Sequence, residues 1–297
     1  MLLAAAQTAL RFHETPDTFA QMVDGWTRQA ATCGASLLVF PEDIGLSLVC
    51  IDDYELTEKV GTLTGLAARM ALRYWRAVVP AALAPRANSR RALFLRRASR
   101  MREVYVDAFS AAARRHKIAI VAGSISLSGD TGHEREVYNT SYTFDARGQV
   151  AGIVRKVGLI QVESRDLGIS SAEIDTVGAF EVDGLCVGVA ICLDAWSAEV
   201  GRRLANTGAQ LLISPQANPD RWTDQEQEQN REGLFARCQQ LGLFGVQAMA
   251  VGSLAGLEFE GCSAILGPKD RTPDGSGIVA QAQSADREEL VVGEVQL

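Results

Sequence analysis

The chain has 297 residues, of which 47% are hydrophobic and 22% are charged, and its formal net charge is -7. These proportions are typical of a globular protein, and the acidic balance argues against a nucleic-acid partner. No apolar run is long enough to span a bilayer, and none of the six cysteines forms a Cys-x-x-Cys pair. We therefore expect a cytoplasmic protein without a metal or other cofactor, whose start at 1–7 is a strand and not a signal peptide.

Apolar strands alternate with amphipathic helices along the chain, which is typical of a layered α/β fold. The pattern predicts a strand at 2–10, then a helix that Thr15 caps and Gly34 ends. The next strand, 37–40, runs almost directly into Glu42. Further elements are expected as a helix at 103–116 and strands at 118–122, 141–144 and 149–154.

The second half of the chain continues the alternation. Ser197 begins one helix, and a capping box of Thr223 and Glu226 begins another that runs to about Leu241. Strands are expected at 180–182, 186–191, 211–214, 246–251, 262–266, 278–282 and 290–295. Because no linker rich in proline, serine or glycine divides the chain, we expect a single domain over residues 1–297.

Cys192 stands at the carboxyl end of a predicted buried strand. The apolar run Val187–Ile191 stops at this thiol, and a polar segment follows. Open α/β sheets place their ligands at the carboxyl ends of strands, where a thiol can attack a carbonyl or nitrile carbon. A lone cysteine in an apolar run is also a common core residue, so the position by itself does not define a nucleophile.

Two charged residues end other predicted strands in the same way. Partial burial of Glu42 would raise the pKa of its carboxyl and suit it to act as a general base. Lys156 follows the strand at 149–154, and an ammonium beside the thiol would favour the thiolate and bind an oxyanion. Each residue also has a simpler interpretation, since Glu42 could cap a helix or pair with an arginine and Lys156 could be a solvated strand end.

The sequences around these residues resemble the nitrilase, or carbon-nitrogen hydrolase, superfamily over nearly the whole chain. The matching motifs are Ala4–Gln7, Phe40-Pro41-Glu42, Tyr138-Asn139-Thr140, Arg155-Lys156, Gly188–Asp194, Gly208–Pro215 and Gly261-Cys262-Ser263. The resemblance implies an α/β fold of the nitrilase type, a four-layer α-β-β-α sandwich, and a homodimer or higher homo-oligomer. It also implies hydrolysis of a non-peptide C–N bond.

The catalytic triad implied by the resemblance is Glu42, Lys156 and Cys192. In such a triad the cysteine forms a thioester and the glutamate transfers protons. The oxyanion is bound by Lys156 and by the backbone N–H of Leu193. Glu163 is the best match for a second glutamate that family members place after the lysine.

Other residues are assigned by their position near these motifs. The residues expected in the substrate pocket are Trp196, Tyr138 and Asn139, although a core position for Trp196 is an equal alternative. Glu134 and Glu136 compete with Glu163 for the role of second glutamate. A Cys-His dyad would need one of the three histidines beside the thiol, and His116 stands in a basic helix end that is expected at the surface.

The chain departs from the family pattern at places that bear on the substrate. After the nucleophile it keeps Asp194 and Glu199 but lacks the arginine and the proline that many members carry. Gly158 stands where a histidine commonly follows the lysine, and Met249 stands near a usual asparagine. Loss of the arginine removes a usual carboxylate-binding group, so a less acidic or more apolar substrate is expected.

An arginine-rich helical insertion at about 63–102 lengthens the connection after Glu42. Between Arg69 and Arg102 the chain has ten arginines and no acidic residue. Such a segment could lie on an anionic membrane surface. Alternatively it packs over the site or across an oligomer interface, with its arginines solvated or paired to acids, and we favour this second interpretation because long loops commonly act as lids.

Helical spacing divides the insertion into two predicted helices. Arg69, Arg73 and Arg76 share one face of the first helix, which Pro80 and Pro85 would end. The second helix would run over 86–102.

We therefore expect an enzyme that hydrolyses a small amide through a cysteine thioester. Nitrile or N-carbamoyl hydrolysis by the same mechanism is one alternative, and acyl transfer to an amine, which the same thioester allows, is another. An alternative of another class is a non-catalytic scaffold or membrane-surface protein that uses the basic insertion.

Overall fold

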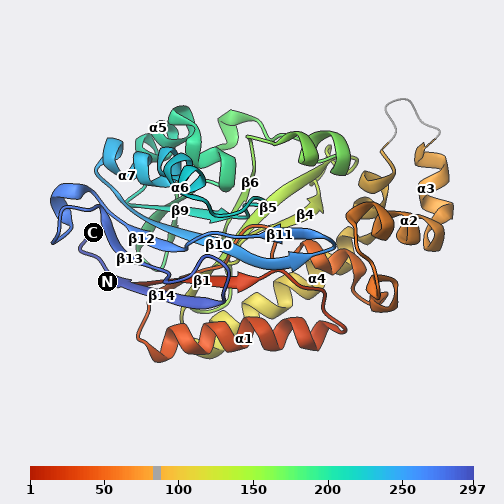
Figure 1. Ribbon diagram of the computed structural model, residues 1–297, viewed down its shortest axis with the longest axis horizontal. Helices are drawn as coiled ribbons and strands as arrows, with labels where there is room; N and C mark the ends of the chain where they lie inside the picture. The colour runs from red at the N-terminus through yellow and green to blue at the C-terminus, as the bar shows by residue number, and fades with distance from the viewer. Residues whose placement is uncertain (83–87) are drawn as a thin grey trace.

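The strands form two sheets that face each other and are joined by one short pairing (Figure 1). The computed structural model describes residues 1–82 and 88–297. The first sheet holds β1 (Leu2–Ala9), β2 (Leu37–Val39), β3 (Ala119–Val121), β4 (Ile125–Ser128), β5 (Val137–Phe144), β6 (Val150–Arg155) and β14 (Glu289–Glu294). The second holds β7 (Phe180–Val182), β8 (Leu185–Val189), β9 (Leu211–Gln216), β10 (Phe244–Leu254), β12 (Ala264–Leu266) and β13 (Ile278–Gln281), with β11 (Leu257–Phe259) beside β10. The sheets join where Thr8 and Ala9 pair in parallel with Ala250 and Val251.

Alternating side chains build the core between the sheets. Leu3 and Ala5 of β1 lie in this central core, which also contains Val246 of the second sheet. Ala4 and Ala6 lie in the core on the opposite face of the strand. Because successive side chains of a strand point to opposite faces, β1 is buried on both sides, and this explains the uninterrupted apolar start of the chain.

Helices cover the outer face of each sheet (Figure 1). The helices that pack on the sheets are α1 (Pro16–Thr32), α4 (Ser89–His116), α5 (Ala198–Asn206) and α7 (Ala236–Leu241), while α6 (Asp224–Asn230) has no buried residue. On the first sheet, Phe109 of α4 packs edge to face on Phe40, with ring centroids 5.0 Å apart. On the second sheet, Leu204 of α5 and Cys238 of α7 pack over Leu212. These layers confirm the predicted four-layer α-β-β-α sandwich.

Side-chain caps begin several helices where the sequence predicts them. The Thr15 hydroxyl accepts the N–H of Thr18 at the start of α1. The Ser197 hydroxyl does the same for Val200 at the start of α5. The short helices are η1 (Leu46–Cys50), η2 (Tyr54–Thr57), η3 (Val162–Leu167), η4 (Ile174–Thr176), η5 (Cys192–Trp196), η6 (Arg231–Phe235) and η7 (Lys269–Arg271).

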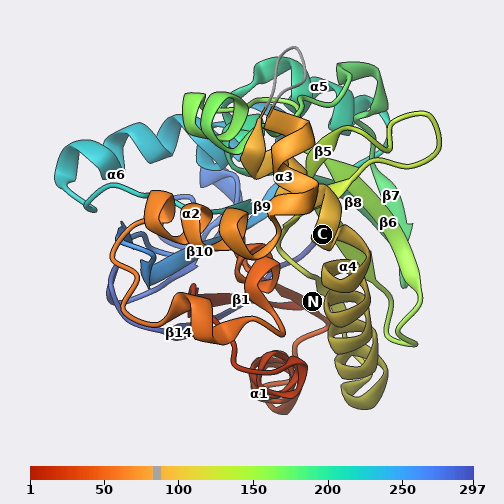
Figure 2. The ribbon, with the colours of Figure 1, turned by 90° about the vertical axis from the view of Figure 1, so that its right-hand side faces the viewer.

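The arginine-rich segment contains α2 (Leu63–Arg73) and α3 (Trp75–Ala82), which lie together beside the sandwich (Figure 2). The prediction that Arg69, Arg73 and Arg76 share a helix face is wrong, because the backbone leaves helical geometry at Tyr74. Helix α3 also continues past Pro80 to Ala82. Pro85 and Arg86 lie outside the described residues.

The predicted helices at 86–102 and 103–116 are one continuous helix, α4. The side chain of Asn88 caps it by accepting the N–H groups of Arg90 and Arg91. The helix then runs without interruption to His116. The arginine-rich segment therefore has no structural end at Arg102, because its last arginines stand on the same helix that covers the first sheet.

Acidic residues just before the segment bind several of its arginines. The Arg100 guanidinium lies 2.9 Å from an Asp52 carboxylate oxygen. Arg73 and Arg97 lie 3.3 and 3.7 Å from the buried Asp53. Part of the positive charge is thus balanced within the fold. Among the described residues, no helix combines the length and apolar character that crossing a bilayer requires.

Candidate active site

Strand topology places Glu42 and Cys192 at one edge of the sandwich. Strands β2, β1, β10, β9 and β8 are linked by parallel pairings, so their carboxyl ends lie on the same side. Glu42 follows β2, and Cys192 follows β8. Lys156 follows β6, and its side chain reaches Glu42 and Glu163. Three strand ends far apart in sequence thus meet at one place.

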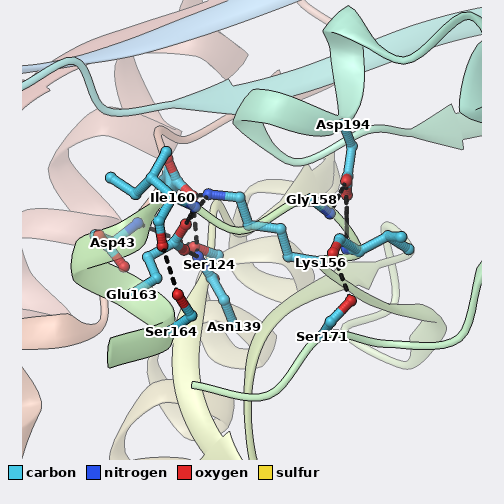
Figure 3. A network of polar contacts seen from close by, with 12 residues as sticks. Asp43, Ser124, Asn139, Lys156, Gly158, Ile160, Glu163, Ser164, Ser171 and Asp194 are labelled. Carbon is cyan, nitrogen blue, oxygen red and sulfur yellow. Dashed lines mark hydrogen bonds and ion pairs between the residues drawn. The ribbon is translucent and has the colours of Figure 1, made fainter. Parts of the chain in front are cut away.

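Lys156 joins two carboxylates in a buried cluster (Figure 3). Its Nζ lies 2.7 Å from Glu42 Oε1 and 2.8 Å from Glu163 Oε2. The exposed fractions of Lys156, Glu42 and Glu163 are 2%, 3% and 7%, so bulk water hardly weakens these contacts. The structure brings the predicted second glutamate, Glu163, into contact with the predicted lysine. Its competitors Glu134 and Glu136 lie in the loop before β5, where Glu136 binds Ser170 and Arg91.

Asn139 and the start of η3 complete the cluster. The Asn139 side-chain N–H₂ donates to Glu42 Oε1 at 2.9 Å and to Glu163 Oε1 at 3.2 Å. The backbone N–H of Ile160 donates to Glu163 Oε2 at 3.0 Å. The carboxylates are therefore held by directed donors, which fixes the position of each oxygen.

The backbone at Cys192 has the left-handed conformation, with φ of 46°. A residue with a side chain seldom adopts this region, and such conformations gather at functional sites. The Glu42 carboxylate and the Lys156 ammonium lie close enough to the Cys192 thiol to influence its pKa. Burial raises the pKa of this thiol, the Glu42 carboxylate raises it further, and Lys156 lowers it. The resting cysteine is therefore a neutral thiol that needs a base to become a nucleophile.

The charges of the cluster are set by burial and by mutual contact. Burial raises the pKa of Glu42, while the Lys156 ammonium lowers it and the Glu163 carboxylate raises it. Burial opposes the charge of Lys156, but Glu42, Cys192 and Glu163 raise its pKa well above the ordinary value. Lys156 therefore keeps its positive charge, and Glu42 is a stronger base than an exposed glutamate.

Two aspartates beside the cluster were not assigned roles from the sequence. Asp194 accepts the backbone N–H of Gly158 at 2.6 Å and that of Val157 at 3.2 Å, which ties η5 to the segment after Lys156. Burial raises the pKa of Asp194 to about 6. A methyl group on Gly158 would lie 3.2 Å from Asp194 Oδ1, which explains a small residue at this position.

Asp43 is the second of these aspartates. It has a left-handed backbone, and its N–H donates to Ser124 Oγ at 3.0 Å. Burial and the carboxylates of Glu42 and Glu163 raise its pKa well above the ordinary value. The only sequence signal for Asp43 is its position next to Glu42.

Tyr138 points away from the cluster of Glu42, Lys156 and Glu163, and its role in the substrate pocket stays a prediction. Neighbouring side chains of a strand point to opposite faces, and Asn139 takes the face that points to Glu42. Tyr138 instead stacks under the Arg155 guanidinium, 4.7 Å from its ring centroid, and lines a surface cavity with His133. The motif residues Tyr138 and Asn139 therefore serve different parts of the fold.

Trp196 and Leu193 lie close to Cys192 in η5. Trp196 is half-buried and packs against Gly233 of η6 within the core under α5 and α7. Leu193 is partly exposed, with 36% of its surface accessible. The roles of Trp196 in the pocket and of the Leu193 N–H in oxyanion binding stay predictions.

The three histidines have partners other than Cys192. His13 packs edge to face on Phe19, and His116 Nε2 lies 2.9 Å from an Asp24 carboxylate. His133 lies 3.5 Å from the Tyr138 hydroxyl. These contacts favour Glu42 over a histidine as the partner of the thiol. Within residues 1–82 and 88–297, no cluster of three or more histidine, cysteine or acidic side chains has the arrangement of a metal site.

The family profile described as carbon-nitrogen hydrolase matches residues 2–297. The chain belongs to the carbon-nitrogen hydrolase family. Among curated proteins it is similar to the 2-oxoglutaramate amidase of Bacillus subtilis (strain 168), with 31% identity over 163 residues, or 54% of this chain and 58% of that protein. It is also similar to nitrilase homolog 2 of Dictyostelium discoideum, with 35% identity over 118 residues, or 38% of this chain and 35% of that protein. These matches span about half or less of the relatives' own lengths.

Solved structures of the same fold include two bacterial proteins. The amidase from Nesterenkonia sp. AN1 superposes with a TM-score of 0.68 at 20% identity, covering 100% of this chain and 90% of that one. The carbon-nitrogen hydrolase from Helicobacter pylori G27 gives a TM-score of 0.68 at 17% identity, covering 99% and 88%. One structure of the Nesterenkonia amidase shows covalent addition of the acetamide moiety of fluoroacetamide at its active-site cysteine.

Proposed function

We propose that this protein hydrolyses the C–N bond of a small non-peptide amide through a thioester on Cys192. The observation that carries the proposal is the position of the Cys192 thiol beside a buried ion pair, in which Lys156 Nζ lies 2.7 Å from Glu42 Oε1. A neutral thiol near a carboxylate of raised pKa is a nucleophile with a base beside it. Family membership and the similarity to two amidases support the same chemistry.

In the first half-reaction the Cys192 sulfur attacks the carbonyl carbon while Glu42 accepts the thiol proton. A C–S bond forms, and the carbonyl oxygen becomes an oxyanion. The Lys156 ammonium and the backbone N–H of Leu193 bind this oxyanion, each contributing roughly 2.7 to 4 kcal/mol to the stability of the transition state. The intermediate collapses, the C–N bond breaks, and Glu42 gives its proton to the departing ammonia or amine.

In the second half-reaction a water molecule attacks the thioester carbon while Glu42 accepts its proton. A second oxyanion forms at the same donors and collapses, and this step breaks the C–S bond and releases the carboxylic acid. The proton on Glu42 returns to the Cys192 sulfur. One carboxylate thus serves as base, acid and base again, which its raised pKa favours.

The same nucleophile permits related reactions, which we rank below amide hydrolysis. Attack on a nitrile or on an N-carbamoyl group uses the same nucleophile, and an amine in place of water would give acyl transfer. The Lys156 ammonium is already paired with two carboxylates, those of Glu42 and Glu163, and this disfavours an anionic substrate. We therefore propose a neutral amide, as the missing arginine after Asp194 also suggests.

The test is intact-mass spectrometry of the protein during incubation with a panel of neutral and carboxylate-bearing amides and nitriles. The wild-type protein should gain the mass of one acyl group, and Cys192→Ala should gain none. Cys186→Ala is the matched control, because Cys186 lies on β8, the strand that leads to Cys192, and is also half-buried. It should behave as the wild type does. Hydrolysis by Cys192→Ala at the wild-type rate would disprove the thioester mechanism.

The cellular compartment and the assembly are also proposals. We propose a cytoplasmic homodimer or higher homo-oligomer, as the family resemblance implies, with a small-molecule substrate and no nucleic-acid partner. Light scattering coupled to gel filtration measures the assembly directly. A monomeric mass at micromolar concentration would reject the homo-oligomer.

A further inference from the structure

Among residues 1–82 and 88–297, Asn139 is the one residue with hydrogen bonds to all three of Glu42, Lys156 and Glu163. Its backbone carbonyl accepts the Lys156 N–H at 2.9 Å. Its side-chain nitrogen donates to both glutamates, to Glu42 Oε1 and Glu163 Oε1. Asn139 is 1% exposed and comes from the middle of β5, so it is held by a strand that is buried along its length (Figure 3).

The two donors that bind Glu42 use the same oxygen. Lys156 Nζ and Asn139 Nδ2 lie 2.7 and 2.9 Å from Glu42 Oε1. Oxygen Oε2 of Glu42 receives neither of them. Because two donors fix Oε1, the Glu42 carboxylate can turn only slightly. Oε2 therefore keeps one direction, in which it is free to accept the thiol proton.

The orientation of the Asn139 amide is set by the glutamates. With the amide reversed, its oxygen would face two carboxylate oxygens, which also carry negative charge. In the orientation observed, no donor among the described residues reaches Asn139 Oδ1 although that atom is buried. A buried acceptor without a partner is uncommon and calls for a functional explanation. Here Asn139 Oδ1 stays without a hydrogen bond, and in this orientation Asn139 Nδ2 donates to both carboxylates.

We infer that Asn139 is a positioning residue that holds Glu42 through Oε1, so that Glu42 Oε2 is the oxygen that accepts the Cys192 proton. The neutral Asn139 amide also bridges the carboxylates of Glu42 and Glu163, which repel each other. A second cation could bridge them too, but it would add a positive charge to the site. This inference rests on the proposed hydrolase function. It replaces the expectation that Asn139 lines the substrate pocket.

The test is the pH dependence of kcat/KM for Asn139→Ala, which removes the side-chain donor and keeps the backbone bond to Lys156. A hydrogen bond to an ionised carboxylate lowers its pKa, so loss of the donor should raise the acid-side pKa of the profile. We expect kcat to fall by roughly tenfold or more, with KM changed little. A residue that only fills space in the core would not move the acid limb.

Ser141→Ala is the matched control. Ser141 lies two residues along β5 on the same face, is 1% exposed, and has a hydroxyl without a partner among the described residues. It should leave kcat and the pH profile unchanged. If Asn139→Ala keeps the wild-type acid limb, or loses rate only together with a lower melting temperature, the positioning role is rejected. If Cys192→Ala is active on the same substrate, the proposed function fails instead, so the two failures are distinguishable.

Discussion

At the scale of single residues, the positive charge of Lys156 is shared by several carboxyl groups of the site. Lys156 is shared by Glu42 and Glu163, and Asp43 stands close enough for all three to influence its pKa. Replacing one neighbour should therefore change the proton affinity of the others in a direction that the charges determine.

Glu163→Gln tests this coupling. Burial raises the pKa of Glu42, and the Glu163 carboxylate raises it further. Removing the Glu163 charge should lower the pKa of Glu42, so the acid limb of the kcat/KM profile should move to lower pH, opposite to the shift expected for Asn139→Ala. A shift to higher pH would contradict the assigned charges. The measurement is initial-rate kinetics from pH 4 to 9, with circular dichroism to check folding.

His13 provides a test of stability outside the site. Burial against Phe19 lowers the pKa of His13 from 6.5 to about 4. Between these pH values the unfolded chain binds more protons at His13, so the free energy of unfolding falls as the pH drops from 6.5 to 4. The loss amounts to about 3 kcal/mol at most. In urea unfolding, His13→Leu should lose less stability over this range than the wild type, and an equal loss would refute the assignment.

At the scale of elements, the segment that carries Glu42 is packed against the turn after β3. Gly123 has φ of 71°, and a methyl group there would lie 2.0 Å from the carbonyl oxygen of Pro41. Gly123→Ala should therefore push away the residue next to Glu42, lower the free energy of unfolding by more than about 2 kcal/mol and reduce activity.

Gly132→Ala is the control for Gly123→Ala, because it introduces the same kind of backbone strain without a clash. Gly132 has φ of 89° but open space around it. It should cost about 1 kcal/mol in chemical unfolding and leave the rate of hydrolysis unchanged. Equal effects of the two substitutions would show that the contact with Pro41 is unimportant.

Arg97 is one of the residues that link α4 to the segment before α2. Its guanidinium donates to the carbonyl oxygens of Val49 and Ile51 and lies 3.7 Å from Asp53. Arg97→Ala should speed hydrogen exchange in η1, η2 and α2, because these carbonyls and the buried aspartate lose their donor. Arg96→Ala, at the exposed neighbouring position, should leave exchange as in the wild type.

The sequence predicts elements and strand ends better than it predicts contacts between them. Glu42, Lys156 and Cys192 could be located because each follows an apolar run, and parallel strands bring such ends together. The sequence does not show which face of β5 points toward the site. Both faces are buried, and apolar or small residues occupy each of them. The sequence alone therefore assigns both Tyr138 and Asn139 to the substrate pocket. The joining of two predicted helices into α4 was missed since arginines interrupt the apolar spacing.

At the scale of the whole molecule, the arginine-rich segment is a basic region in a protein whose net charge is negative. Arg73, Arg97 and Arg100 are paired with Asp52 and Asp53. We expect no binding to anionic vesicles in a flotation assay at physiological ionic strength, because paired charges attract a charged surface weakly. Flotation with anionic but not neutral vesicles would support the membrane-surface alternative instead.

The continuity of α4 limits how this protein can be engineered. A helix of 28 residues is about 42 Å long and bends little, so its two halves move together. Excision of residues 63–102 would cut it between Arg102 and Glu103 and expose four backbone N–H groups with no cap. A shortened protein needs a new capping residue ahead of Tyr105, whose hydroxyl binds the carbonyl of Ala122 directly before Gly123. Without that cap, fraying of the shortened helix would reach the same turn that supports Glu42.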